Sequence, residues 1–157
     1  MIDASMSVIS IDRSRPFNPN DFIGQNWTVN EQDEHSLALT ELDPREVRLE
    51  TTLKGGEQYV QGEEKLRRLK QAGYIRLDAK IFQRFWEDQR MIPEIWKAES
   101  DGLSTYIFFD GTVFQNPDGD RCVLFISWEM TVRRWFWYLY WLKDGCAASD
   151  KSAILQR

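Results

Sequence analysis

The chain has 157 residues, the usual size of one domain built around one hydrophobic core. Its formal net charge of −5 argues against a general binder of polyanions, because nonspecific phosphate binding needs a surplus of Lys and Arg. Seven Trp, five Tyr and nine Phe predict a core made largely of aromatic rings. We expect residues 1–21 to form a flexible leader and residues 22–157 to form a single domain.

The part of the chain before residue 55 predicts one or two short strands. Residues 22–29 and 37–42 have strand-like patterns and are joined by a charged loop over 30–36. Segment 43–54 has two interpretations. Asp43, Pro44 and Glu46 are typical of a helix start, whereas the alternation of Val47, Leu49 and Leu53 favours a strand. The alternation leads us to prefer the strand.

Two helices follow, at about 62–72 and 78–91. In the first, Glu63 with Arg67 and Glu64 with Arg68 are i,i+4 pairs in the favourable order, and Gly73 is typical of the position after a helix. The charged run over 63–70, which includes Lys65, predicts a solvated face. In the second helix, Asp78 is a suitable N-cap, and the apolar residues share one face: Ile81, Phe82, Phe85 and Trp86. Pro93 then ends the helical region.

Residues 104–142 predict an antiparallel meander of three or four strands. Asp110-Gly111 is a strong signal for a two-residue hairpin, and residues 116–119 predict a type I turn with a trailing glycine. The last hairpin joins strands over 121–129 and 134–142, and the register that pairs Glu129 with Arg134 also pairs Trp128 with Trp135. The predicted fold is therefore α+β, with this meander, two helices and the short N-terminal strands. The tail after residue 142 carries a final apolar pair, Ile154 and Leu155.

The predicted register of the last hairpin separates two faces. One face is apolar throughout. The other carries the residues that we regard as a candidate partner-binding surface, namely Phe125, Arg134, Phe136, Tyr138 and Tyr140. This outer face is either covered by helix 78–91 or exposed, and the sequence leaves both alternatives open.

Cys122 and Cys146 lack CxxC spacing and a neighbouring histidine cluster, so we expect reduced thiols and neither a zinc site nor a disulfide scaffold. The first twenty residues lack a basic segment followed by an apolar run, so a secretory signal is not expected. The aromatic run over 134–142 is too short to cross a bilayer. These features predict a cytoplasmic protein with no membrane segment, no metal and no cofactor.

Several motifs resemble a set of uncharacterised bacterial proteins from small-genome lineages. They are YIRLDAK at 74–80, IPEIWK at 92–97 and IFFDGTV at 107–113, followed by the aromatic hairpin with Trp128, Trp135, Trp137 and Trp141. The resemblance covers about residues 22–155 and departs from the pattern at 130–134, where similar sequences have a tighter turn. It implies a bacterial family and no particular activity, cofactor or catalytic residue.

Catalytic chemistry has little support in the sequence. The acids Asp110, Asp118, Asp120 and Glu129 lie near predicted hairpin ends, where Asp usually serves the geometry of the turn rather than acid–base work. The single histidine, His35, lies in a polar loop without a nucleophile motif. We therefore assign no catalytic residue and expect the protein not to be an enzyme.

The sequence leaves three functions, in order of preference. The first is a non-catalytic intracellular module that binds another protein, in a regulatory or immunity-type accessory role. The second is single-stranded nucleic-acid binding, with bases stacked on the aromatic outer face. The third is a small hydrolase that uses the turn carboxylates. The sequence does not determine the oligomeric state.

Overall fold

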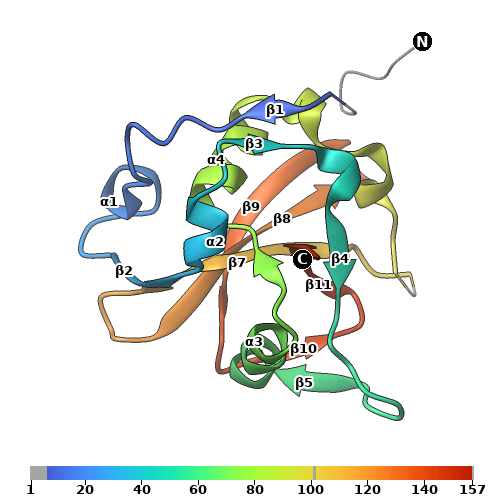
Figure 1. Cartoon of the computed structure of the whole chain (residues 1–157). Helices are drawn as coiled ribbons and strands as arrows, with labels where there is room; N and C mark the ends of the chain where they lie inside the picture. Colours follow the sequence, from blue (N-terminus) through green and yellow to red (C-terminus); the bar gives the residue numbers. More distant parts are fainter. Residues whose placement is uncertain (1–6, 101, 157) are drawn as a thin grey trace.

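The computed structural model of the chain describes residues 7–100 and 102–156 (Figure 1). The strands are β1 (Ile9–Ser10), β2 (Thr28–Gln32), β3 (Glu41–Leu42), β4 (Arg48–Glu50), β5 (Tyr59–Gln61), β6 (Ile75–Arg76), β7 (Tyr106–Gln115), β8 (Arg121–Glu129), β9 (Arg134–Trp141), β10 (Gly145–Ala147) and β11 (Asp150–Leu155). The helices are α1 (Pro19–Phe22), α2 (Glu34–Leu37), α3 (Gly62–Gln71) and α4 (Ala79–Glu87), and 3₁₀ turns span Pro44–Glu46, Gln89–Met91 and Glu94–Lys97. The predicted α+β class is confirmed.

The main sheet has the strand order β4-β11-β7-β8-β9, with β2 added to β7 and β6 added to β11. Strands β7, β8 and β9 form the predicted meander. Strand β11 enters the sheet between β4 and β7 and runs parallel to β7, whereas the other pairs are antiparallel. Strands β1 with β3 and β5 with β10 form two small separate pairs. Strand β9 therefore lies at one edge of the main sheet.

Both predicted long helices are present. Asp78 caps α4 by accepting a hydrogen bond from the Lys80 N–H, and α4 ends at Glu87, after which a 3₁₀ turn continues to Met91. Helix α3 ends before Gly73, whose positive φ of 75° is the left-handed conformation expected there. The apolar face of α4 packs on the sheet, and α3 lies below it with β5 and β10 (Figure 1).

The predicted hairpin at Asp110-Gly111 is wrong, because β7 continues through both residues. Strand β7 advances five residues from Phe109 to Phe114, while β8 advances only two from Leu124 to Cys122, so β7 bulges at this point. Gly111 meets the backbone of β6 in the bulge: an ideal Cβ on it would lie 2.1 Å from the Arg76 carbonyl oxygen. The glycine thus serves a close backbone approach and not a turn. The turn at 116–119 is present, with Gly119 at φ 89°.

The N-terminal strand boundaries differ from those expected. Asn18 and Pro19 form the N-cap and first residue of α1, so a helical turn occupies the start of the predicted strand 22–29, and β2 begins only at Thr28. Asp33 caps α2 in the segment that was predicted to be a loop. Of the predicted strand 37–42, only Glu41–Leu42 pairs with another strand.

Segment 43–54 contains both of the structures between which the sequence left a choice. Asp43 caps a 3₁₀ turn over Pro44–Glu46, and the alternating residues then form β4, which pairs with β11.

The leader predicted over 1–21 is packed from Ile9 onward: β1 pairs with β3, and Ile9, Ile11 and Phe17 are buried. The part of that prediction that concerns residues 1–6 lies outside the described residues.

Each face of the main sheet has its own hydrophobic cluster. The α4 face holds the larger one, in which Phe82 and Phe85 pack near Phe109 and Leu124. The opposite face holds a smaller cluster that joins β7 and β8 to α3, β5 and β10, with the members Val60, Leu66, Phe108, Val113, Val123, Phe125, Leu142 and Cys146. Most of the sheet is therefore covered on both faces, whereas most side chains of β9 are only partly buried.

Candidate functional site

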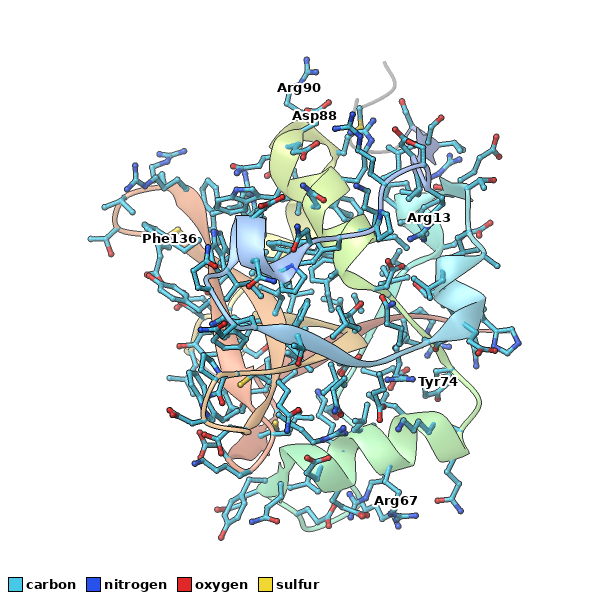
Figure 2. The ribbon with its side chains drawn as sticks, turned by 90° about the vertical axis from the view of Figure 1, so that its left-hand side faces the viewer. Arg13, Arg67, Tyr74, Asp88, Arg90 and Phe136 are labelled. Carbon is cyan, nitrogen blue, oxygen red and sulfur yellow. The ribbon has the colours of Figure 1, made fainter. Side chains whose placement is uncertain are left out.

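The β8–β9 hairpin has the register predicted from the sequence, from Cys122 opposite Trp141 to Glu129 opposite Arg134. Four residues connect the strands, and Arg133 in this loop has a positive φ of 54°. Figure 2 shows the hairpin projecting from the body of the molecule, with Phe136 on it. The exposed Met130 and Val132 form its tip.

The face of β9 that carries Trp135, Trp137, Leu139 and Trp141 is turned towards α1 and α4. The ring of Trp137 lies 4.8 Å from that of Phe22 and 6.4 Å from that of Phe82, measured between centroids. The alternative in which helix 78–91 covers the outer face is therefore excluded. Among the described residues, α3, β5 and β10 cover the outer face at the end that holds Val123 and Leu142.

The five predicted partner-binding residues do not share one environment. Phe125 is only 5% exposed, because the rings of Tyr106, Phe108, Tyr138 and Tyr140 surround it. Tyr140 is half-buried and its hydroxyl donates to the Gly145 carbonyl, and burial raises the pKa of this hydroxyl. Phe125 is thus a core residue, which a continuous alternating pattern on a strand cannot distinguish from a surface residue.

The other three predicted residues form an accessible row on the outer face. Tyr138 is 51% exposed, Phe136 is half-buried, and their rings are stacked with centroids 6.3 Å apart and planes 13° apart. The Arg134 guanidinium lies 5.0 Å from the centroid of the Phe136 ring, a cation–π arrangement.

A groove lies along the free side of β9, and we call it the edge groove. It has a volume of about 540 Å³ and is lined by Trp86, Phe136, Trp137, Tyr138, Leu139 and Trp141. Four of these residues were not among the predicted partner-binding residues, namely Trp86, Trp137, Leu139 and Trp141. The signal that points to them is positional: β9 is the last strand of a meander, and such a strand lies at an edge unless another strand covers it.

The hydrogen-bonding pattern identifies the open backbone groups of β9. The Leu142 N–H donates to the Arg121 carbonyl, so Leu142 belongs to the set whose groups face β8. In an antiparallel pair these sets alternate, so Trp135, Trp137, Leu139 and Trp141 direct their N–H and C=O groups away from β8. Within the described part of the chain, one of these outward groups has a backbone hydrogen bond: the Trp141 carbonyl accepts from the Asp144 N–H.

The candidate carboxylates are dispersed along the meander. Asp118 and Asp120 lie at the β7–β8 turn, where the side-chain oxygen of Asn116 accepts hydrogen bonds from both of their N–H groups. Glu129 lies at the opposite end of β8. Asp110 is buried within β7, so the prediction that it is a turn residue is wrong.

Asp110 belongs to a buried polar group around α3. Its Oδ2 accepts a hydrogen bond of 2.5 Å from the Ser152 hydroxyl, and its Oδ1 has no hydrogen-bond partner among the described residues. Lys65 is 1% exposed and donates to the Asp150 carbonyl at 2.7 Å, which corrects the prediction that it lies on a solvated face. Burial raises the pKa of the Asp110 carboxyl and lowers the pKa of the Lys65 ammonium.

The rest of the charged face of α3 is largely as predicted. Arg68 pairs with Glu64 at 2.8 Å, and it also pairs with Glu57 at 2.7 Å. Arg67 points into solvent in Figure 2 and pairs with Glu64 instead of Glu63, whose partner is Arg121. These contacts serve the fold and do not form a pocket with the buried group.

Both cysteines are buried and unpaired, and no cluster of metal-binding side chains occurs in residues 7–100 and 102–156. His35 is on α2, where its side chain is 61% exposed and its Nδ1 lies 3.8 Å from Asp33. None of the helices over these residues is long and apolar enough to span a bilayer.

No protein-family model, curated protein or solved structure matches this chain. The resemblance to uncharacterised bacterial proteins therefore remains a sequence expectation. The edge groove and the row of Arg134, Phe136 and Tyr138 are the surface features on which a functional argument can rest.

Proposed function

We propose that this protein is a non-catalytic module that binds another protein through the edge groove and the adjoining outer face of β9. The observation that carries the proposal is the open edge of β9, an eight-residue strand with one charged residue, Arg134, and no proline. Natural sheets usually protect such an edge with charges, proline or a covering segment. An unprotected aromatic edge is suited to a partner that covers it.

The chemistry of the groove favours a protein as that partner. Its lining is aromatic or aliphatic throughout, with Trp and Tyr prominent, and these residue types dominate the energetics of protein interfaces. The open N–H and C=O groups of β9 add directional hydrogen bonds for an extended segment, the binding mode known as strand addition.

Single-stranded nucleic acid is the second candidate, and one observation favours it. The stacked rings of Phe136 and Tyr138, with the Arg134 guanidinium beside them, resemble a platform for bases. The charges weigh against it. The chain has a net charge of −5, and a groove that tracks a phosphate backbone needs several cations along its length.

The protein-binding proposal is tested by capture followed by reconstitution. The wild type and a Phe136→Ala/Tyr138→Ala variant are used as bait in a lysate of cells that encode the protein. Each protein retained only by the wild type is then purified and titrated by calorimetry. We expect direct binding that is at least tenfold weaker in the double variant. Tyr59→Ala is the matched control, because Tyr59 is 69% exposed on β5 and does not line the groove.

The nucleic-acid alternative is tested by fluorescence anisotropy with labelled single-stranded DNA and RNA at low and physiological salt. We expect no binding at physiological salt, because phosphate contacts weaken steeply as salt rises. Micromolar binding at physiological salt that disappears in an Arg134→Ala/Tyr138→Ala variant, still folded by circular dichroism, would favour the nucleic-acid platform and contradict the proposal.

A further inference from the structure

The geometry points to a second copy of this chain as the partner at the edge groove: we infer that two copies join their β9 strands in antiparallel orientation and form one continuous sheet. The inference rests on the proposed function, since it names the occupant of the same site. It is carried by three properties of β9, which are its backbone pattern, its side chains and the charges at its two ends.

The backbone pattern permits the pairing. The outward N–H and C=O groups belong to Trp135, Trp137, Leu139 and Trp141, so two copies can exchange hydrogen bonds only when these residues lie opposite one another. A two-fold axis at Tyr138 satisfies this condition: Trp137 then faces Leu139 of the second copy, and Trp135 faces Trp141. The Trp141 carbonyl already accepts from the Asp144 N–H and retains a second lone pair.

The side chains are self-complementary in this register. On the α4 face, Trp137 meets Leu139 of the second copy, and both line the edge groove. On the outer face, the half-exposed Tyr138 meets its own counterpart across the axis, and Phe136 meets Tyr140. Every cross-strand contact between residues 135 and 141 therefore joins apolar or aromatic groups, which are favourable pairs on an antiparallel sheet.

The charges at the ends of β9 favour the antiparallel arrangement. Arg133 precedes the strand and Arg134 begins it, with Glu129 as the cross-strand neighbour of Arg134. The other end carries Asp118, Asp120 and Asp144. Its cations are Lys143, which lies 3.5 Å from Asp120, and Arg121, which is paired with Glu31 and Glu63. Arg134 and Asp144 are both exposed, and neither forms an ion pair within the described residues. A two-fold axis at Tyr138 brings the basic end of each copy to the acidic end of the other.

Individual positions agree with this complementarity. In the register with the axis at Tyr138, Arg134 lies opposite Leu142 of the second copy, next to the turn in which the Asp144 N–H donates to the Trp141 carbonyl. A parallel arrangement would instead place like charges together at both ends.

The covering layer leaves room for the second copy. Helix α4 packs chiefly on β7, and Trp86 from its last turn forms only one wall of the edge groove. A two-fold axis perpendicular to the sheet keeps the two α4 helices on the same side, each over its own strands.

The test measures molecular mass against concentration by analytical ultracentrifugation. We expect the wild type to form a dimer in a concentration-dependent equilibrium. Tyr138→Asp and Tyr138→Arg should each be monomeric, because each places two like charges across the axis. An equimolar mixture of the two variants should regain the dimer, since opposite charges then meet. Tyr59→Asp is the matched control and should dimerise like the wild type, because Tyr59 is more exposed than Tyr138 and lies outside the groove.

Two results would overturn the inference. One is a wild type that remains monomeric up to about 1 mM. The other is a dimer that both Tyr138 variants retain, which would place the contact elsewhere. Circular dichroism of each variant shows that it is folded. A monomeric wild type that still binds a purified partner through Phe136 and Tyr138 refutes the second copy and leaves the proposed function standing, so the two failures are distinguishable.

Discussion

Gly111 is the position where the smallest chemical change should have the largest effect on stability. An alanine Cβ built on its backbone would lie 2.1 Å from the Arg76 carbonyl oxygen and 2.6 Å from the Leu77 carbonyl carbon. These atoms belong to the backbone, so no rotation of a side chain can relieve the contact. Gly111→Ala must therefore separate β7 from the segment at Arg76 and Leu77.

The expected cost follows from the contacts at this crossing. Overpacking by one methyl group costs about 1–3 kcal/mol. The separation also strains two hydrogen bonds, from the Gly111 N–H to the Leu77 carbonyl at 2.9 Å and from the Asp33 N–H to the Gly111 carbonyl at 2.7 Å. Each contributes about 0.5–1.5 kcal/mol, so Gly111→Ala should lower the free energy of unfolding by about 2–6 kcal/mol. This is a large part of the about 5–15 kcal/mol of an ordinary domain.

Urea denaturation followed by tryptophan fluorescence and circular dichroism measures this cost. Gly55→Ala is the matched control, because a Cβ on Gly55 would meet no atom within 4 Å. We expect a much lower midpoint for Gly111→Ala and an almost unchanged midpoint for the control. Equal midpoints for the two variants would show that the close approach of Gly111 to Arg76 does not exist in the folded protein.

Three further predictions concern the buried polar groups. Burial raises the pKa of the Asp110 carboxyl above its ordinary value of 3.8. The protonated carboxyl therefore contributes its full stability below pH 3.8, and this contribution is lost as the pH rises through the raised pKa. Asp110→Asn should therefore gain stability relative to the wild type as pH rises, in urea titrations across acidic and neutral pH, and a pH-independent difference would contradict this. Burial raises the pKa of Cys122 to about 12 and that of Cys146 to about 11, so both thiols should resist Ellman's reagent at pH 8 until the chain is unfolded. Lys65→Met should cost about 1–3 kcal/mol through the loss of its buried hydrogen bonds, whereas Arg67→Met on the exposed face should change stability by less than about 0.5 kcal/mol.

The sequence predicted the structure correctly where a segment's conformation depends on residues within that segment. Asp78 caps α4 and Gly73 follows α3, as predicted, because a cap acts within a few residues of itself. The register of β8 and β9 was also predicted in full, since alternation and one closing pair, Glu129 with Arg134, determine it.

Predictions from the sequence were wrong where a residue serves a distant segment. Asp110-Gly111 has the composition of a hairpin turn, but Gly111 is there to admit the backbone at Arg76 and Leu77. Lys65 lies within a charged run, yet its ammonium is held by the carbonyl oxygen of Asp150. Such contacts depend on the tertiary fold, and neither periodicity nor turn propensity reports them.

The candidate site was predicted in part for the same reason. Arg134, Phe136 and Tyr138 lie on an accessible face, whereas Phe125 is buried beneath rings from β7 and β9. The alternation of a strand assigns residues to faces but does not say what covers each face. The edge groove arises because β9 is the last strand of the sheet over the described residues, and this position is a property of the whole sheet.

The place of β11 in the sheet has a consequence for how the chain folds during synthesis. Strand β11 lies between β4 and β7, with β6 also paired to it. Among the described strands, β4 and β6 therefore have only residues 150–155 as their partner, whereas β7 also pairs with β2 and β8. While the ribosome is still adding those residues, β4 and β7 have exposed apolar side chains and no neighbour between them. The nascent chain must therefore remain incompletely folded, and open to capture by a chaperone, until β11 leaves the ribosomal exit tunnel.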